Sequence, residues 1–485
     1  GTTRLRAAAD RKLAASRGGA LSIAKYLERY AEPEVRLASL VPGRYRAVLI
    51  VPAHRERAES IDGMRRAAAA AGGRVLVVLV VNAAEDSSDS ARAETRELAF
   101  ELEQRFGAPL RLAEDPPLAL YELPELSLLL VDRASAGHEL PAKQGVGLAR
   151  KIGADLALAL WAAGRVELEW LFSTDADVEL PPDYFTAAAE ITSAPVRGRS
   201  GAVGQPPRSG AAANKTVGLL FPFRHGGGGD ALVDASTELY ELTLRYHVLG
   251  LKFAASPYAY HSIGSALAVS AEAYAAVRGF PRRLAGEDFY LLDKLAKIGL
   301  LQPVSSAPIA IRARLSDRVP FGTGPRVREL CRQAASGETV LVYHPATYRA
   351  LRNVLEVFQL VSRKRDQVEF ASALTLADPE LGPLASRALS ELGLDGELSR
   401  ALRETKTEVV LHRRLLTWFD ALRTLRFIHA LRDSGAANLP VQEALEQAPF
   451  VPRGALTRDS AEALAALADA ERESAGPRGV PACFP

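Results

Sequence analysis

The sequence predicts an α/β fold, in which helices cover both faces of a mostly parallel sheet, followed by an all-helical region. Three runs, 47–51, 75–81 and 126–131, are apolar except for Ser127 and have the length of strands. Helical patterns separate them, and strands that are apolar on both faces are typical of a sheet buried on both sides. From residue 326 onward, leucine, alanine, arginine and glutamate recur at helical spacing. Two kinds of structural unit are therefore expected in one chain.

The expected domain boundaries follow breaks in this pattern, and a chain of 485 residues has room for two or three domains. We expect an N-terminal helical extension over residues 1–44, an α/β domain over 45–325 and a helical C-terminal domain over 326–485. Residues 322–325, Gly-Thr-Gly-Pro, mark the second boundary. The segment 194–229 is rich in glycine, proline and serine, and is expected to be an active-site flap or a slack insertion.

Composition argues against several classes of function. The chain carries a net charge of +2, with 48% hydrophobic and 24% charged residues, so bulk electrostatic binding of nucleic acid is not expected. No apolar run reaches the roughly 18 residues of a transmembrane segment. The two cysteines, Cys331 and Cys483, lie far apart without metal-ligand spacing, which favours a reducing compartment. The expected location is the cytoplasm, with peripheral attachment to the inner face of a membrane left open.

The most informative motif is Asp175-Ala176-Asp177, which follows the apolar run 170–172. In open α/β sheets, ligands bind at the carboxyl edge of the strands, and side chains at i and i+2 of an extended segment point the same way. Two such carboxylates can hold a hard divalent cation, Mn²⁺ or Mg²⁺, with positions left for substrate phosphates. The alternative is a loop whose acids cap the helix that Pro181-Pro182-Asp183 begins.

Two strands are expected to bring further polar residues to the same edge. The first ends in Pro52-Ala53, and the turn that follows delivers Glu56 to the edge of the sheet. The second ends in Asn82, whose amide can hydrogen-bond the edge of a nucleotide base. Both strands therefore point toward a nucleotide-binding role for this edge.

Two helix starts complete the set of candidate residues. Lys143 and Arg150 lie in the glycine-rich opening of a helix, which suits an anionic phosphate. Glu287 and Asp288 begin an amphipathic helix, where one carboxylate is suited to act as a general base. The alternative for this second pair is a helix start whose acids are favoured by the macrodipole.

Together, in this order, these motifs resemble the nucleotide-sugar-dependent glycosyltransferases of family 2, whose fold is known as GT-A. The resemblance covers about residues 45–325, and the helical C-terminal domain is an addition to it. The opening motif of the family, Val-Pro-x-x-Asn-Glu, has Arg55 in place of its asparagine here. The acid with which the family contacts the nucleotide base is replaced by Asn82. Both departures leave the identity of the base open.

The resemblance implies a GT-A-type, Rossmann-like sheet and the metal-dependent transfer of a sugar from a nucleotide-diphosphate donor to an acceptor hydroxyl. It places Mn²⁺ or Mg²⁺ on Asp177 and Asp175, and makes Asp288 the general base, with Glu287 orienting the acceptor or the helix start. One base opposite the leaving group gives inversion at the anomeric carbon, and retention is a subordinate alternative. The residues expected to bind the donor are Pro52, Ala53, Glu56, Asn82, Lys143, Arg150, Asp175 and Arg318.

Arg318 is the last of three arginines, after Arg312 and Arg314, that follow the acidic helix. It precedes a glycine-containing loop, where its side chain could contact the departing diphosphate. A solvated strand face is the alternative for this series of arginines.

Two other functions compete with the transferase. A sugar-1-phosphate nucleotidyltransferase is expected to carry a glycine-rich basic loop after the first strand, where this chain has the segment 52–56, Pro-Ala-His-Arg-Glu. A non-catalytic scaffold with a glycosyltransferase fold is the other alternative, although Asp175, Asp177 and Asp288 argue against it. The acceptor is left open as a saccharide, a lipid or a small molecule. So is the assembly of a homo-oligomer through the C-terminal helices.

Overall fold

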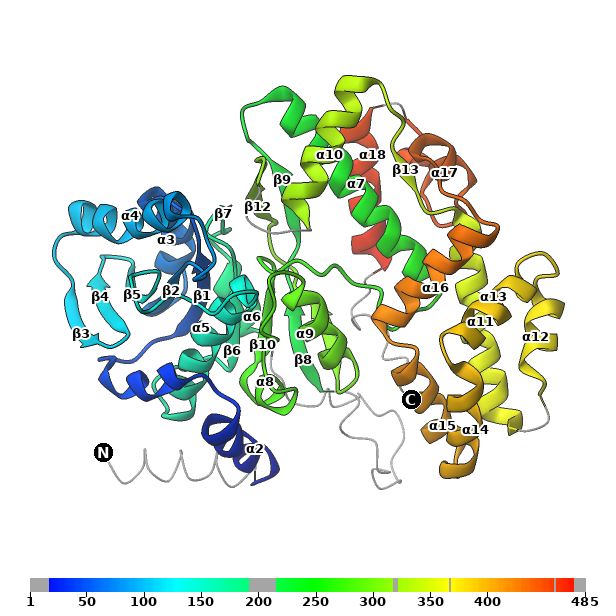
Figure 1. The fold of residues 1–485 in the computed structure, drawn as a ribbon, viewed down its shortest axis with the longest axis horizontal. Coiled ribbons are helices and arrows are strands. Elements are labelled where there is room, and N and C mark those ends of the chain that lie inside the picture. The colour runs from blue at the N-terminus through cyan, green and yellow to red at the C-terminus, as the bar shows by residue number, and fades with distance from the viewer. Residues whose placement is uncertain (1–16, 192–214, 317–321, 366–367, 458, 475–485) are drawn as a thin grey trace. The chain divides into compact units, whose positions relative to one another are not determined.

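The computed structural model describes residues 17–191, 215–316, 322–365, 368–457 and 459–474 (Figure 1). The chain forms two compact units. The first contains the described parts of 1–197, 215–227 and 262–325, and the second those of 228–261 and 326–485. The helical unit therefore includes a segment from within the range expected for the α/β domain.

The first unit is built on a nine-stranded sheet of order β11-β8-β10-β6-β1-β2-β5-β4-β3 among the described residues. Its strands are β1 (Ala47–Ala53), β2 (Val75–Asn82), β3 (Leu110–Glu114), β4 (Pro117–Glu122), β5 (Leu126–Arg133), β6 (Trp170–Ser173), β8 (Thr216–Leu220), β10 (Leu267–Ser270) and β11 (Leu300–Pro303). The four central strands, β6, β1, β2 and β5, run parallel. Antiparallel pairs flank them, because β10 opposes β6 and β8, and β4 opposes β5 and β3. The expected mostly parallel sheet is thus confirmed at its centre.

Helices cover both faces of this sheet, as the continuous apolar strands predict (Figure 1). The helices are α3 (Asp62–Ala69), α4 (Asp89–Phe106) and α6 (Tyr184–Ala189) on one face and α5 (Gly145–Ala162) on the other. Leu49 of β1 shares one buried core with Met64 of α3 and Leu98 of α4. Ile50 points to the opposite face, where a Cβ atom added to Gly153 of α5 would lie 2.7 Å from the Ile50 side chain. The α/β class of the prediction is confirmed.

The N-terminal helical segment is fixed to the first unit by a buried polar network. Its elements are α2 (Arg17–Arg29) and η1 (Pro33–Leu40), and they contact α5 and α8 (Ala271–Ala276). The Asp155 carboxylate of α5 accepts hydrogen bonds from Tyr26 Oη at 2.6 Å and Tyr274 Oη at 2.8 Å. It also accepts from the Lys151 ammonium at 2.9 Å and from the Glu32 amide at 2.8 Å. Because every partner is buried, the network anchors this segment to α5.

A second, three-stranded sheet positions the residues next to Asp177. Its strands are β7 (Val178–Glu179), β12 (Ile309–Arg312) and β9 (Phe223–Gly226) in the order β7-β12-β9. The antiparallel pairing of β12 with β7 places the Arg312 amide 3.1 Å from the Asp177 carbonyl oxygen, to which it donates. The chain that follows β12 therefore runs beside the Asp-x-Asp segment.

The second unit is helical and has its own hydrophobic core. Its elements are α7 (Ala231–Phe253), most of α10 (Thr323–Ser336), α11 (Pro345–Lys364), α12 (Phe370–Ala377), α13 (Gly382–Glu391), α14 (Leu394–Glu404), α15 (Glu408–Trp418), α16 (Ala421–Ser434), α17 (Val441–Gln447) and α18 (Ser460–Ser474), with a short pair β13 (Leu341–Val342) and β14 (Leu439–Pro440). Tyr348, Phe358 and Phe427 are fully buried in this core. Arg245 of α7 forms an ion pair with Glu471 of α18, which joins the inserted helix to the last described one.

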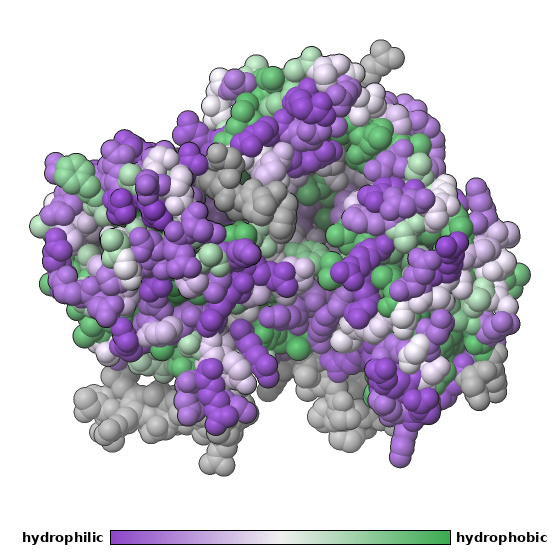
Figure 2. Space-filling view, viewed as in Figure 1, coloured by the Kyte–Doolittle hydropathy of each residue, from purple (hydrophilic) through white to green (hydrophobic). Residues whose placement is uncertain are grey.

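Hydrophilic residues cover most of the molecular face seen in Figure 2, and hydrophobic ones are scattered among them. Within the described residues, none of the helices has both the length and the apolarity needed to cross a lipid bilayer.

Candidate active site

The turn that carries Asp175 and Asp177 is held on both sides by tight contacts. Thr174, at the end of β6, donates a hydrogen bond from Oγ1 to the Ser265 carbonyl oxygen at 3.0 Å. On the other side, the Leu180 amide donates to the Gly63 carbonyl oxygen of α3 at 2.8 Å. A Cβ atom at Gly63 would lie only 2.0 Å from the Val178 carbonyl oxygen, so glycine allows this close approach. These contacts therefore fix the path of the backbone that carries the two aspartates.

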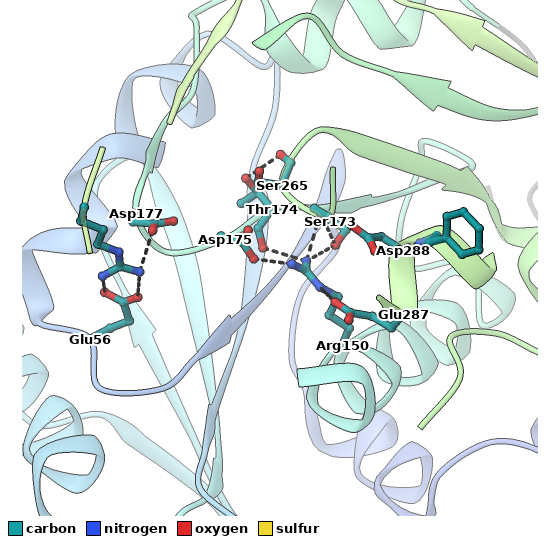
Figure 3. Close-up of polar contacts among 12 residues, drawn as sticks. Glu56, Arg150, Ser173, Thr174, Asp175, Asp177, Ser265, Glu287 and Asp288 are labelled. Carbon is teal, nitrogen blue, oxygen red and sulfur yellow. Dashed lines mark hydrogen bonds and ion pairs between the residues drawn. The ribbon is translucent and has the colours of Figure 1, made fainter. Parts of the chain in front are cut away.

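Arg150 connects the Asp-x-Asp motif to the acidic pair at the start of α9 (Glu287–Ala296), as Figure 3 shows. Its Nε donates to Glu287 Oε1 at 2.7 Å, and its Nη2 pairs with the Asp175 carboxylate. Its Nη1 donates to Ser173 Oγ at 2.7 Å and to the Gly264 carbonyl oxygen at 3.1 Å. The Arg150 side chain is 3% exposed. A buried guanidinium thus joins two motifs that are far apart in the sequence.

Asp288 lies in the first turn of α9, next to this ion pair. Its side chain is half-buried, and its Oδ1 accepts a hydrogen bond from the Phe289 amide at 2.7 Å. The pKa of Asp288 is raised to about 7, first by burial and then by the neighbouring Glu287 charge, while the Arg150 charge opposes both. A carboxyl group whose pKa lies near neutrality is suited to proton transfer at physiological pH.

Asp177 is paired with a different arginine, Arg314, which follows β12. Arg314 Nη2 lies 2.6 Å from Asp177 Oδ2 and 2.8 Å from Glu56 Oε1. The Arg314 side chain is 30% exposed and that of Asp177 is 19% exposed. This cluster brings together the turn after β1, the Asp-x-Asp motif and the segment after β12. Figure 3 shows Asp175 and Asp177 engaged with separate partners.

The structure argues against the expected contact between Arg150 and a donor phosphate. The guanidinium is enclosed and hydrogen-bonded to protein groups, and the start of α5 is covered as well. The Gly147 amide donates to the Arg283 carbonyl oxygen at 3.0 Å, and a Cβ atom at Gly147 would lie 2.5 Å from the Pro281 carbonyl oxygen. The glycines in this helix start thus serve close packing. Lys143, just before the helix, is exposed.

Asn82 lies at the expected edge of the sheet, but its amide group is used within the fold. The side chain is 5% exposed, and Nδ2 donates to the carbonyl oxygens of Ala53 at 3.1 Å and Val80 at 3.0 Å. The bond to Ala53 ties the ends of β1 and β2 together. Pro52 and Ala53 are buried within β1. Both Asn82 amide hydrogens are therefore directed to backbone groups, which argues against a hydrogen bond from this amide to a nucleotide base.

Arg318, the remaining residue expected to bind the donor, lies outside the described residues.

In the sequence, Arg314 is one of a series of arginines, and no local pattern predicts its contact with Asp177. The alternation of apolar and other residues in 309–312 indicates a strand, but not which strand it pairs with. The pairing of β12 with β7 supplies that missing information.

The donor set fits a hard divalent cation in its chemistry and its charge. No three aspartate, glutamate, histidine or cysteine side chains form a ready-made metal site within the described ranges. The acidic residues of the two linked clusters are Glu56, Asp175, Asp177, Glu287 and Asp288. Among the described residues, these carboxyl groups outnumber the guanidinium groups of Arg150 and Arg314 whether or not Asp288 is protonated. An anionic diphosphate would be repelled here unless a cation came with it, and carboxylate oxygens are ligands that Mn²⁺ and Mg²⁺ accept.

Comparisons with known proteins give distant structural likenesses alone. No family model matches the sequence, and a search of curated proteins found no match. A mannosyltransferase from Pyrobaculum calidifontis, solved with GDP-mannose and Mn²⁺, aligns over 97% of this chain and 99% of its own, with 16% identity and a TM-score of 0.30. A mycobacterial protein aligns over 65% of this chain and 84% of its own, with 12% identity and a TM-score of 0.26. At these TM-scores, neither likeness bears on the activity of this chain.

Proposed function

We propose that the first unit is a metal-dependent glycosyltransferase that moves a sugar from a nucleotide-diphosphate donor to an acceptor hydroxyl with inversion. One observation carries this proposal. Arg150 binds Asp175 and Glu287 at the same time, so the motif suited to a donor and the motif suited to a base belong to one centre. Asp175 and Asp177 follow β6 at the carboxyl edge of the parallel strands, which is the ligand-binding edge of open α/β sheets.

On the donor side, Asp177 and Asp175 would hold Mn²⁺ or Mg²⁺. When bound, that cation supplies charge neutralisation for the diphosphate leaving group. Glu56, bound with Asp177 to the same guanidinium, completes the acidic border of this side. The donor nucleotide is proposed to lie along the ends of β1 and β2, next to Ala53 and Asn82, with the exposed Lys143 near its phosphates.

On the acceptor side, Asp288 is the proposed general base. The acceptor oxygen attacks the anomeric carbon while its proton passes to the Asp288 carboxylate, and the bond between the sugar and the diphosphate breaks. A pKa of about 7 keeps this carboxyl basic enough to take the proton and ionised in part at neutral pH. Glu287 holds the start of α9 against Arg150 and so orients the base. A base on the face opposite the leaving group produces inversion.

The test is a panel of nucleotide sugars, including UDP-glucose, UDP-N-acetylglucosamine and GDP-mannose, screened with Mn²⁺ by thermal unfolding. A true donor is expected to raise the unfolding temperature, because a ligand that binds the native state stabilises it by mass action. The stabilising sugar nucleotide should then release nucleoside diphosphate. Release of pyrophosphate from a sugar-1-phosphate and a nucleoside triphosphate would contradict the proposal in favour of a nucleotidyltransferase. Neither stabilisation nor release with any donor would favour a non-catalytic scaffold.

A further inference from the structure

Arg314 is placed where a cation would have to bind. Its Nη2 lies 2.6 Å from Asp177 Oδ2, a carboxylate that the proposed function gives to Mn²⁺ or Mg²⁺. The same nitrogen contacts Glu56 Oε1 at 2.8 Å, so one guanidinium holds both carboxylates. A divalent cation on Asp177 would lie next to this positive charge. Because like charges repel strongly in a partly enclosed site, the arginine and the cation compete for the carboxylate.

We propose that Arg314 is a resident counter-ion of the donor site. It neutralises Asp177 and Glu56 while no donor is bound, and gives up Asp177 to the divalent cation when a nucleotide diphosphate arrives. The inference rests on the proposed function and adds a step that the function alone does not require. The displaced guanidinium then faces the diphosphate, whose oxygens it can bind with the two-pronged geometry that it uses on carboxylates.

The surroundings of Arg314 suit such an exchange. Its ion-pair partners among the described residues, Asp177 and Glu56, are carboxylates, and its side chain is 30% exposed. It lies beyond the end of β12, in a segment without regular secondary structure. A guanidinium that binds carboxylates near solvent can turn to another anion without leaving a backbone carbonyl unsatisfied.

The test compares Mn²⁺ binding by the full chain and its Arg314→Gln variant, measured by electron paramagnetic resonance of free Mn²⁺. Without nucleotide, Arg314→Gln is expected to bind Mn²⁺ about tenfold more tightly, because one charge-assisted pair no longer competes. With GDP or UDP present, the same variant is expected to bind Mn²⁺ and the nucleotide about tenfold more weakly, because the phosphate contact is lost. The effect of Arg314→Gln on Mn²⁺ affinity should therefore change from a gain without nucleotide to a loss with nucleotide, and only the proposed exchange predicts this change.

Arg312→Gln is the matched control. Arg312 lies two residues away on β12 with its side chain exposed, so its removal should leave both affinities as in the wild type. Arg314→Lys keeps the charge with fewer donors and should bind Mn²⁺ with intermediate affinity. It carries the test if Arg314→Gln unfolds.

Two failures can be told apart with Asp177→Asn. Mn²⁺ binding that is lost in Asp177→Asn but unchanged in Arg314→Gln would overturn the counter-ion role and leave the proposed function in place. Mn²⁺ binding that is the same in the wild type and in Asp177→Asn would overturn both, because the cation would then lie elsewhere.

Discussion

The two arginines that pair with the Asp-x-Asp motif differ in almost every physical respect. Arg150 projects from a long helix, is 3% exposed and is hydrogen-bonded to backbone carbonyls as well as to carboxylates. Arg314 follows a short strand, is 30% exposed and binds carboxylates. Asp175, whose own side chain is 38% exposed, is therefore paired with a guanidinium that is fixed in the fold, whereas Asp177 is paired with one that lies nearer to solvent. The difference lies in the two arginines, and both aspartates are proposed ligands of the cation.

The largest effect is expected from Arg150→Met, which tests the structural side of this comparison. Removing the guanidinium leaves the buried Glu287 carboxylate without its countercharge. We expect a loss of about 3–5 kcal/mol in the free energy of unfolding of the first unit. Arg314→Gln should cost about 1 kcal/mol or less, because its ion pairs are closer to solvent. Urea unfolding of both variants checks the contrast.

The double variant Arg150→Met/Glu287→Gln is the control for this prediction. It removes the unpaired buried charge and should recover part of the lost stability. Equal losses in Arg150→Met and Arg314→Gln would remove the distinction between the two arginines.

The second effect is the pH dependence of sugar transfer, which is set by Asp288, next to the ion pair of Arg150 and Glu287. Asp288 must be ionised to accept a proton, and its pKa is raised to about 7. We expect kcat/KM to fall about tenfold for each pH unit below that value and to level off above it. Initial rates between pH 5 and 9, at saturating Mn²⁺, measure this profile. A rate that stays constant down to pH 5 would show that Asp288 is not the base.

The third effect is expected from Gly63→Ala, which tests how the packing of α3 against β7 positions Asp177. A Cβ atom there would lie 2.0 Å from the Val178 carbonyl oxygen, so Gly63→Ala must push β7 away from α3. We expect a loss of about 1–3 kcal/mol in the free energy of unfolding, together with weaker Mn²⁺ binding. Gly396→Ala is the matched control, because Gly396 is an exposed residue of α14 with open space around it. That substitution should stabilise the helical unit by about 0.5–1 kcal/mol. Unchanged Mn²⁺ affinity in Gly63→Ala would contradict the account of the turn.

A final effect is a gain in stability from Asp288→Asn. The pKa of this carboxyl is raised from 3.8 in an open chain to about 7, so its ionised form is less favourable in the native state than in the unfolded state. The native state therefore loses stability as the pH rises from about 4 to 7. The substituted amide stays neutral throughout, so the variant should unfold at a higher temperature than the wild type at pH 8, with a smaller difference at pH 5. Calorimetry that finds the variant less stable at pH 8 would refute the raised pKa.

Much of the sheet could be predicted from the sequence, because its information is local. The runs that became β1, β2 and β5 are apolar except for Ser127, and each is followed by polar or turn residues. That pattern predicts parallel strands and places Glu56, Asn82 and Asp175 near one edge. The helical character of the C-terminal region follows from spacing in the same way.

The partners of the charged side chains could not be predicted, because they depend on tertiary packing. Gly147 and Arg150 look like a phosphate-binding helix start, yet the same glycine allows the chain near Arg283 to approach. Likewise, the pattern of α7 specifies a helix but not that it joins the second unit. The pairing of Arg314 with Asp177 depends on β12 finding β7, which no local pattern encodes.

In the proposed function, one centre contains both a donor-binding carboxylate and a separate base. The most direct test measures donor binding by calorimetry and nucleoside diphosphate release in the same preparations of wild type, Asp177→Asn and Asp288→Asn. We expect Asp288→Asn to bind Mn²⁺ and the sugar nucleotide as the wild type does but to release almost no product, whereas Asp177→Asn should lose metal-dependent binding. Product release by Asp288→Asn at the wild-type rate would contradict the proposed function.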